Sequence, residues 1–402
     1  MKYIVVLGDG MADEPIAQLG GRTPLEAADT PVMDALAAKS EIGLVRTIPD
    51  GMKPGSDTAN LAVMGYDPKK YYTGRSPLEA LSIGVPMEDT DVALRCNIVT
   101  LSEEEPYAQK RIIDHSSGEI STEDAAILLE AVRAELENDT YHFYVGTSYR
   151  HCTIWKNGSV VPLTPPHDHL GEVIGAYLPE DDVLRRMQER SYEILANHPI
   201  NVERKAKGLN PANSLWFWGA GTKPLLSPFE ELYGKQGVMI SAVDLLKGIA
   251  VGAGMQNVIV PGANGGLHTN YEGKAQAAVD ALLKEGADFA YIHLEAPDEM
   301  GHQGSLERKL QAIENLDSRI LRIVKEQMDA SGESYRLLLL PDHPTPLRIR
   351  THSAEPVPYL LYDSTSPVDS HVLYNEKTAK ESGIYREQGY RMMNYLLSGI
   401  YE

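Results

Sequence analysis

Seven side chains that could bind metal ions or act as a nucleophile stand at four widely separated places along the chain. They are three carboxylates, three imidazoles and one hydroxyl, with no thiolate among them: Asp9, Ser56, Asp298, His302, Asp342, His343 and His352. Mixed oxygen and nitrogen ligands suit Mn²⁺, Mg²⁺ or Zn²⁺, and the set is large enough for two ions. Two such ions clamp the attacking and leaving oxygens of a phosphoryl displacement. The residue types therefore predict metal-dependent phosphoryl transfer.

Ser56 is the candidate nucleophile. It lies in "KPGSDTANLAVMGYDP", after Pro-Gly and before a helix-like apolar stretch. A helix start favours bound phosphate, because free backbone N–H groups and the helix dipole face it. Taken alone, Ser56 is also typical of a helix N-cap, Asp9 of a turn, and a D-x-x-x-H pair of a solvated loop. We interpret His293, within a strand-like run, as structural. The occurrence of four complementary ligand segments in one chain favours a site.

The candidate residues follow segments that are typical of buried strands. The apolar runs "KYIVVLG", "ADFAYIHL" and "YRLLLL" precede Asp9, Asp298 and Asp342, and "PVPYLLYDS" predicts one further strand. Apolar residues at helical spacing predict a helix over 305–328, and "TPVMDALAAKS" predicts another, with Thr30 as its N-cap. Strands alternating with helices predict a parallel α/β sheet, with the chemistry at the carboxyl ends of its strands.

The middle of the chain has a different texture. Polar segments alternate with shorter strand-like runs such as "ALRCNIVTL", "YHFYVG" and "HCTIWKNG", and a helix is expected at "TEDAAILLEAVRAELEN". We expect an α+β domain at residues 88–185, inserted into a core formed by residues 1–87 and 186–402. The segment "PEDDVLRRMQERSYEILANHP" is expected to lead back into the core, and "SLWFWGAG" to be the next core strand.

Charge and composition limit the partners. The net charge is −20 at pH 7, so nucleic acid and anionic membranes are not expected as partners, because both would repel the chain. The two cysteines, Cys96 and Cys152, cannot form a disulfide framework. No segment approaches the ~20 apolar residues of a membrane span. We expect a soluble, cytoplasmic protein, and the sequence leaves a homo-oligomer open.

The motifs "GDGMAD", "PGSDTANLAVMGYDP", "APDEMGHQG", "PDHPTP" and "RTHSAEPVP" together resemble those of the archaeal-type cofactor-independent phosphoglycerate mutases, within the alkaline phosphatase superfamily. The resemblance covers most of the chain, including "RCNIVTL", "GTSYRHCTIW" and "LNPANSLWFWGAG". It implies an alkaline-phosphatase-like, mostly parallel central sheet flanked by helices, with an inserted α+β cap. It also implies two sets of metal ligands: Asp9, Ser56, Asp342 and His343 for one ion, and Asp298, His302 and His352 for the other.

The resemblance implies the interconversion of 3-phosphoglycerate and 2-phosphoglycerate in glycolysis or gluconeogenesis, with no requirement for 2,3-bisphosphoglycerate. Ser56 would take the phosphoryl group, and the other hydroxyl of the trapped glycerate would take it back. Two divalent ions are implied, Mn²⁺ first, with Zn²⁺ or Mg²⁺ as alternatives. The insert would be a hinged cap that excludes water during the phosphoenzyme stage.

Five residues are candidates for substrate contacts: Arg150, Arg95, His151, Lys223 and Asn60. Arginine binds carboxylate and phosphate bidentately, so Arg150 in "SYRH" and Arg95 in "LRCN" are favoured over His151 and Lys223. Each of these side chains has a surface or structural ion-pair role as its alternative. Asn60, one turn after Ser56, could orient phosphate or face solvent.

Other functions stay open at this point. A homoserine kinase-like phosphotransferase fits the same resemblance, although the chain has no G-x-x-x-x-G-K-[ST] loop. A metal-dependent phosphatase or phosphonate-processing enzyme would result if the cap failed to exclude water. A non-catalytic binder of phosphorylated metabolites is a further alternative, but a degenerate site would be expected to lose ligands. The G-x-S-x-G motif of α/β-hydrolases is absent.

Overall fold

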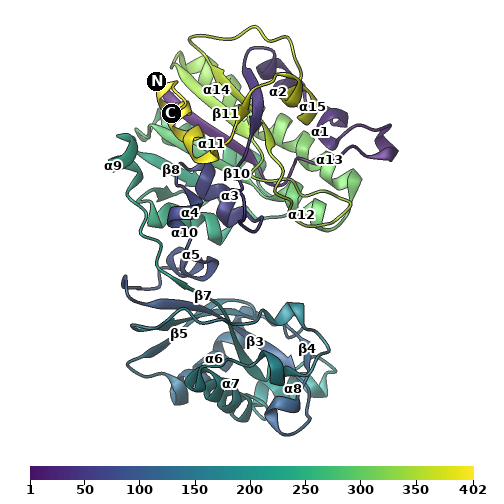
Figure 1. The fold of residues 1–402 in the computed structure, drawn as a ribbon, viewed down its shortest axis with the longest axis vertical. Helices are drawn as coiled ribbons and strands as arrows, with labels where there is room; N and C mark the ends of the chain where they lie inside the picture. Colours follow the sequence, from purple (N-terminus) through teal and green to yellow (C-terminus); the bar gives the residue numbers. More distant parts are fainter. The chain divides into compact units, whose positions relative to one another are not determined.

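A computed structural model describes all 402 residues, which form two compact units (Figure 1). The first unit, here called the core unit, consists of Met1–Tyr72 and Leu226–Glu402, and the second consists of Thr73–Leu225. None of the helices combines the length and the apolar character needed to cross a membrane. The α/β fold class predicted from the sequence is confirmed, and each unit is described by itself below.

The core unit is built on an eight-stranded sheet with the order β13-β2-β12-β11-β1-β10-β8-β9. The strands are β1 (Lys2–Gly8), β2 (Glu41–Val45), β8 (Gly237–Ile240), β9 (Gln256–Asn257), β10 (Phe289–Leu294), β11 (Tyr335–Leu340), β12 (Val357–Asp363) and β13 (Tyr385–Arg386). All neighbours are parallel except that β12 is antiparallel to both β11 and β2. The mostly parallel sheet expected from the sequence is confirmed, with β12 as its one antiparallel strand. No helix lies between β11 and β12, and a parallel return would need such a crossover.

The central strands are continuous apolar runs because helices cover both faces of the sheet. The helices of the core unit are α1 (Pro24–Ala27), α2 (Pro31–Ala37), α3 (Ser56–Val63), α4 (Pro68–Tyr71), α9 (Phe229–Tyr233), α10 (Asp244–Gly252), α11 (Tyr271–Leu283), α12 (Ala296–His302), α13 (Leu306–Asn315), α14 (Arg322–Ser331), α15 (Glu376–Glu381) and α16 (Met392–Ser398). Residues of α2, α11, α13 and α14 pack with Ile4, Val6 and Ile292 in one hydrophobic cluster. Tyr291 alternates with Ile292, so it points to the opposite face, where α3 lies.

The helix predicted over 305–328 is present with an irregularity. It consists of α13 and α14 joined by a π-helical turn at Leu316–Leu321. That turn carries Asp317, whose carboxylate accepts the backbone N–H groups of Val32 and Met33 at the start of α2. Thr30, the predicted N-cap of α2, makes no capping bond with its side chain. The cap of this helix therefore comes from a distant segment.

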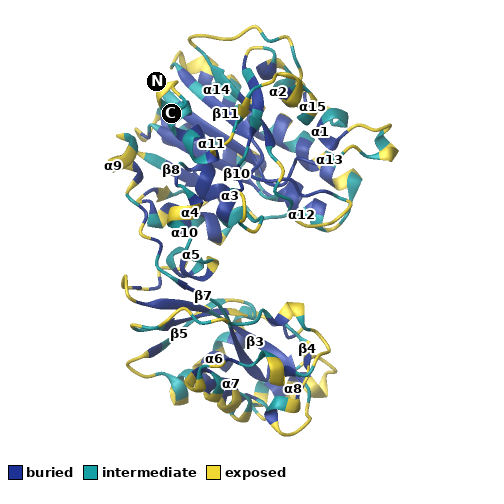
Figure 2. Cartoon of the chain, viewed as in Figure 1, coloured by how far each residue is buried: buried dark blue, intermediate teal, exposed yellow.

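The second unit is built on an antiparallel five-stranded sheet with helices on both faces. Its strands are β3 (Val92–Leu101), β4 (Ile112–Asp114), β5 (Tyr141–Thr147), β6 (Arg150–Trp155) and β7 (Ser214–Thr222), and its helices are α5 (Arg75–Ser82), α6 (Thr122–Leu136), α7 (Asp182–Leu195) and α8 (Pro199–Ala206). β3 pairs with β6 along one edge and with β7 along the other. Helices α6 and α7 pack on the sheet in one cluster. The buried strands and exposed outer helix faces are visible in Figure 2.

Two expectations about the boundaries of the insert are corrected. Residues 73–87 and 186–225, assigned to the core from the sequence, lie in the second compact unit. The run "SLWFWGAG" is strand β7, which pairs with β3 of the second unit and is not a core strand. Helix α7 packs on β7 in the same unit. An apolar run predicts a buried strand, but only long-range pairing decides which sheet the strand joins.

Candidate two-metal site and nucleophile

The seven candidate residues meet at the carboxyl edge of the core sheet. The strand register brings the ends of β1, β10 and β11 level, so the residues after them leave the sheet together. Asp9 follows β1, Asp342 follows β11, and α12 after β10 carries Asp298 and His302. Helix α3 brings Ser56 to the same edge. The site is thus built from the strand ends predicted from the sequence.

A first group consists of Asp9, Asp342 and His343. One ligand atom from each residue lies within 4.8 Å of the others, and all three side chains are buried. The hydroxyl of Ser56 lies 3.0 Å from His343 Nε2 and 3.4 Å from Asp9 Oδ2. The structure therefore brings together the four residues proposed for one metal ion.

A second group lies beside the first. Ligand atoms of Asp298, His343 and His352 are within 4.8 Å of one another. His302 Nε2 is 3.1 Å from Asp298 Oδ2 and 3.0 Å from His352 Nε2. The rings of His343 and His352 have centroids 3.9 Å apart. The three residues proposed for the second ion are together, and His343 lies within reach of both groups rather than of one alone.

Backbone carbonyls set the orientation of two of the imidazoles. His343 Nδ1 is 3.1 Å from the carbonyl oxygen of Pro344, and His302 Nδ1 is 2.9 Å from that of Arg350. A carbonyl can only accept, so each Nδ1 carries the proton and donates it. Nε2 of each ring therefore faces the site, where it can offer a lone pair to a metal ion once it has lost its own proton. A carbonyl bound to the outer nitrogen is the usual way in which proteins orient a metal-binding histidine.

The carboxylates of the site are crowded and buried. Burial raises the pKa of Asp9 well above its usual value, and the negative charges of Asp342, Asp298 and Glu295 raise it further. Burial also opposes ionisation of Asp298, but hydrogen bonds from His302 and His352 hold its pKa well below the usual value. The bond to Asp298 raises the pKa of His302 to about 9. The protein itself supplies only imidazoles as possible counter-charges in direct contact with these acids.

The donor set fits divalent cations. Asp9 Oδ1 is buried and has no hydrogen-bond partner, which is costly for a carboxylate oxygen unless a cation binds it. Several carboxylates in one buried cluster repel one another, and bound cations would remove that repulsion. Oxygen and imidazole ligands without thiolates are suited to Mn²⁺, Zn²⁺ or Mg²⁺.

Asp342 is held by contacts on every side. Its Oδ1 accepts the backbone N–H groups of Gly10, at 3.1 Å, and of His343, at 2.8 Å. The Thr47 hydroxyl donates to its carbonyl oxygen. Gly10 has a φ of +63°, and an added Cβ would lie 2.8 Å from the Cα of Asp298, so only glycine fits. The loop after β1 is therefore packed directly against both ligand groups.

Asn60 has a different position from the one expected. It is fully buried, and its Nδ2 donates to Asp342 Oδ2 at 3.0 Å and to the carbonyl of Ser56 at 2.8 Å. Its Oδ1 accepts the Tyr291 hydroxyl at 2.6 Å. These bonds use both amide hydrogens, so no donor is left for a substrate. The interpretation of Asn60 as a substrate contact is corrected.

His293 was interpreted as structural, and the structure gives it a direct contact with the site. Its Nε2 is 2.8 Å from Asp9 Oδ2, and its Nδ1 is 3.1 Å from the Ser241 hydroxyl. Burial lowers the pKa of His293 to about 3, so the ring is neutral and donates from Nε2 to Asp9. The sequence signal that could have indicated this contact is a single histidine near the end of the apolar run "FAYIHL".

Thr345 is a second residue that sequence reasoning missed. Its hydroxyl donates to Asp298 Oδ1. Its carbonyl oxygen accepts Lys309 Nζ at 2.9 Å, and the same ammonium lies 2.8 Å from Asp13 Oδ2. Lys309 and Asp13 form a buried ion pair that joins the loop after β1 to the loop after β11. A threonine three residues after Asp342 carries no distinctive sequence signal.

The two candidate arginines of the second unit differ in whether their guanidinium groups are already paired with a carboxylate. Arg150 is exposed and lies over the Tyr149 ring, 5.3 Å from its centroid. Arg95 donates through two nitrogens to Glu79, at 2.9 Å each, and lies over the Trp218 ring. The two arginines share one face of the sheet, because Arg95 is opposite Cys152, two residues from Arg150. Arg150 is thus the freer of the two cations.

The two weaker candidates of this unit also differ. His151 is opposite Cys96, so its side chain points to the other face of the sheet from that of Arg150. It is buried, its Nδ1 accepts the Gly146 N–H at 3.1 Å, and burial lowers its pKa to about 4. His151 is therefore corrected to a residue of the domain interior. Lys223 is partly exposed and pairs with Asp89 at 3.3 Å.

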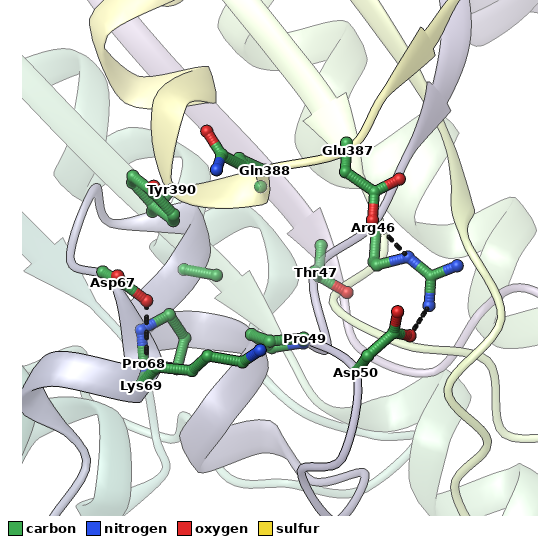
Figure 3. A pocket seen from close by; sticks show the side chains of 12 residues that line it. Arg46, Thr47, Pro49, Asp50, Asp67, Pro68, Lys69, Glu387, Gln388 and Tyr390 are labelled. Atoms are coloured by element: carbon green, nitrogen blue, oxygen red, sulfur yellow. Dashed lines mark hydrogen bonds and ion pairs between the residues drawn. The ribbon is translucent and has the colours of Figure 1, made fainter.

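A separate hollow of about 170 Å³ lies beside β2 and the residues after β13 (Figure 3). Charged residues that line it form ion pairs with one another: Arg46 pairs with Asp50 at 2.7 Å and with Glu387 at 3.4 Å. It contains none of the seven candidate ligands. Thr47, which also bonds Asp342, is the residue that links this hollow to the site.

Comparisons with known proteins show which family the chain resembles. Residues 37–201 match the family model described as 2,3-bisphosphoglycerate-independent phosphoglycerate mutase. A protein of that name from Methanosarcina barkeri is 50% identical over 391 residues, which are 96% of each chain. A Geobacter sulfurreducens protein, described as a probable mutase of this kind, is 47% identical over 99% of this chain and 100% of its own length.

Solved structures extend the comparison. A protein from Pyrococcus horikoshii has a TM-score of 0.81 at 28% identity, covering 98% of this chain and 96% of its own. A cofactor-independent phosphoglycerate mutase from Thermoplasma acidophilum has a TM-score of 0.68 at 26% identity, covering 98% and 99%. The resemblance carried by the sequence motifs is confirmed. The chain belongs to the family of 2,3-bisphosphoglycerate-independent phosphoglycerate mutase enzymes.

Proposed function

We propose that this enzyme interconverts 3-phosphoglycerate and 2-phosphoglycerate through a phosphoserine at Ser56. The observation that carries the proposal is the position of the Ser56 hydroxyl, 3.0 Å from His343 Nε2 and 3.4 Å from Asp9 Oδ2, where the two ligand groups meet. Membership of the mutase family supports this reaction over homoserine phosphorylation and over phosphate hydrolysis.

Two divalent ions, Mn²⁺ first, are part of the proposal. One would be held by Asp9, Ser56, Asp342 and His343. The other would be held by Asp298, His302 and His352, and His343 lies within reach of it as well. When bound, such ions stabilise the negative charge that develops on the transferring phosphoryl group. The unpartnered Asp9 Oδ1 supports their presence.

Ser56 is the residue that would accept and return the phosphoryl group. Ser56 begins α3, so the positive end of the helix dipole lies beside its hydroxyl and favours a phosphoryl group there. The Ser56 oxygen forms a bond to phosphorus while the bond to one glycerate oxygen breaks. The other hydroxyl of glycerate then attacks the phosphoserine and releases Ser56. The two transfers balance, so no external donor is consumed.

Arg150 is our candidate for holding the substrate carboxylate. Its guanidinium is exposed and has no carboxylate partner within the protein, unlike that of Arg95. A planar guanidinium binds a carboxylate through two parallel hydrogen bonds. Lys223 is a secondary candidate, because it is already paired with Asp89.

The test compares Ser56→Ala with the native chain. We expect Ser56→Ala to abolish both mutase activity and the phosphoserine detected by mass spectrometry after brief incubation with 3-phosphoglycerate. Ser121→Ala is the control, because Ser121 caps α6 in the second unit, and its loss should leave turnover intact. The native chain is also offered homoserine with ATP. Activity of Ser56→Ala, or product only from homoserine, would contradict the proposal.

A further inference from the structure

A buried chain of hydrogen bonds links a tyrosine of the sheet to the candidate metal site. Tyr291, in the middle of β10, donates its hydroxyl to Asn60 Oδ1 at 2.6 Å. Asn60, on α3, donates from Nδ2 to Asp342 Oδ2 at 3.0 Å and to the Ser56 carbonyl at 2.8 Å. Tyr291 and Asn60 are both 0% exposed, so bulk water contacts neither side chain.

The contacts permit only one orientation of the Asn60 amide. The groups facing Nδ2 are a carboxylate and a carbonyl, which only accept hydrogen bonds. The group facing Oδ1 is a phenol hydroxyl, which can donate. A rotated amide would place its oxygen against two acceptors and its hydrogens against the phenol. The three partners therefore hold the amide in one orientation. Tyr291 supplies the one bond to Oδ1, and the other two partners bind Nδ2.

Asn60 connects the candidate nucleophile to a candidate metal ligand through hydrogen bonds. Its two donated bonds join the first residue of α3, Ser56, to the carboxylate of Asp342. The other oxygen of that carboxylate is held by the backbone of Gly10 and His343. The amide thus determines the rotation of the Asp342 carboxylate and its separation from Ser56, without touching substrate or metal.

We propose that Tyr291 and Asn60 act together as positioning residues that hold Asp342 in its metal-binding orientation and in register with Ser56. The inference rests on the proposed metal site. Groups that hydrogen-bond a metal ligand typically change metal affinity by about 10–100-fold when they are removed. The Tyr291 hydroxyl donates its hydrogen bond to Asn60, so we expect its effect on Asp342 to depend on the asparagine being present.

The experiment is a double-mutant cycle read out by Mn²⁺ binding. Metal-free native protein, Tyr291→Phe, Asn60→Ala and the double variant are titrated with Mn²⁺ by calorimetry. We expect Tyr291→Phe to weaken the affected site by about 10-fold and Asn60→Ala by at least as much. The double variant should match Asn60→Ala alone, because the phenol then has nothing to position.

Tyr335→Phe is the matched control. Tyr335 is also a buried tyrosine of the same sheet, and its hydroxyl bonds Asp329 at 2.8 Å, but it stands at the first residue of β11, at the end of the strand away from Asp342. It should lose similar stability and keep native Mn²⁺ affinity.

Each outcome decides between the two proposals. Uptake of Mn²⁺ by the native protein with unchanged affinity in Tyr291→Phe overturns the positioning role alone. Independent, additive losses in the double variant overturn the coupling through Asn60. A native protein that binds no Mn²⁺ overturns the proposed metal site and the positioning role together.

Discussion

Replacing Asp9 by asparagine should stabilise the metal-free core unit. Asp9 is buried, its Oδ1 has no partner, and the carboxylates of Asp342 and Asp298 raise its pKa. Asparagine keeps an oxygen that accepts the His293 proton, removes the charge and supplies an amide that can donate to Asp342. The change therefore removes the repulsion between the residue 9 carboxylate and the carboxylates of Asp342 and Asp298. It also gives the unpartnered position of Asp9 Oδ1 a hydrogen-bond partner.

The size of the effect follows from the geometry. Ligand atoms of Asp9 and Asp342 lie within 4.8 Å of each other. Two unit charges at that separation repel by about 3 kcal/mol at an effective dielectric constant of ~20. Protonation of Asp9 relieves part of this, so we expect Asp9→Asn to gain about 2 kcal/mol at pH 8 in the presence of a chelator.

The sign of the pH dependence is also determined. The folded pKa of Asp9 is raised above its unfolded value, so ionisation destabilises the fold. This cost is absent below the unfolded pKa and grows as the pH rises towards the folded one. The advantage of Asp9→Asn should therefore be small near pH 4 and increase with pH.

Metal ions should reverse the order of stability. Mn²⁺ at about 100 times its dissociation constant adds about 2.7 kcal/mol to a protein that binds it in the folded state only. The native chain should gain this stabilisation, and Asp9→Asn should gain little. Asp13→Asn is the matched control: Asp13 is buried but paired with Lys309, so its loss should destabilise by about 3 kcal/mol with or without metal.

Urea unfolding followed by circular dichroism measures these differences. All three tryptophans, Trp155, Trp216 and Trp218, lie in the second unit, so tryptophan fluorescence reports that unit and should be unchanged in Asp9→Asn. A metal-free Asp9→Asn less stable than the native chain would refute the repulsion argument. Equal stabilisation of both proteins by Mn²⁺ would refute the role of Asp9 as a ligand.

Three further predictions concern other parts of the chain. Asp317→Ala should cost about 1–2 kcal/mol in urea unfolding and leave kcat unchanged, because Asp317 caps α2 from outside the site. Arg150→Ala should raise KM for 3-phosphoglycerate by at least about 10-fold, with partial recovery in Arg150→Lys, whereas an unchanged KM would exclude Arg150 from substrate binding. Burial raises the pKa of Glu376 to about 7, so its ionisation costs stability as pH rises from its unfolded pKa through 7. Glu376→Gln should therefore gain stability relative to the native chain at pH 8 and lose that advantage at pH 4, as measured by thermal unfolding.

Much of the candidate site was predictable because its signals are local. Asp9, Asp298 and Asp342 each follow an apolar run, and the carboxyl ends of parallel strands meet at one edge of a sheet. The residue types then limit the chemistry, because carboxylates and imidazoles without thiolates suit divalent metal ions. Neither inference needs the position of any other segment.

Long-range pairing decided what the local pattern left open. The run "SLWFWGAG" is equally apolar in either unit, and only its pairing with β3 places it in the second. The direction of β12 depends on the connection from β11, which has no crossover helix. The cap of α2 comes from Asp317, some 280 residues away in the chain.

Local residue patterns were enough to predict the kinds of ligand and the strand ends that carry them. Which side chains hold those ligands in place depended on how distant segments pack. Asn60 proved to bond Asp342, His293 to bond Asp9, and His151 to point into the interior of its domain. The physical reason is that strand and helix periodicity are properties of neighbouring residues, whereas a hydrogen bond between side chains depends on where distant segments pack.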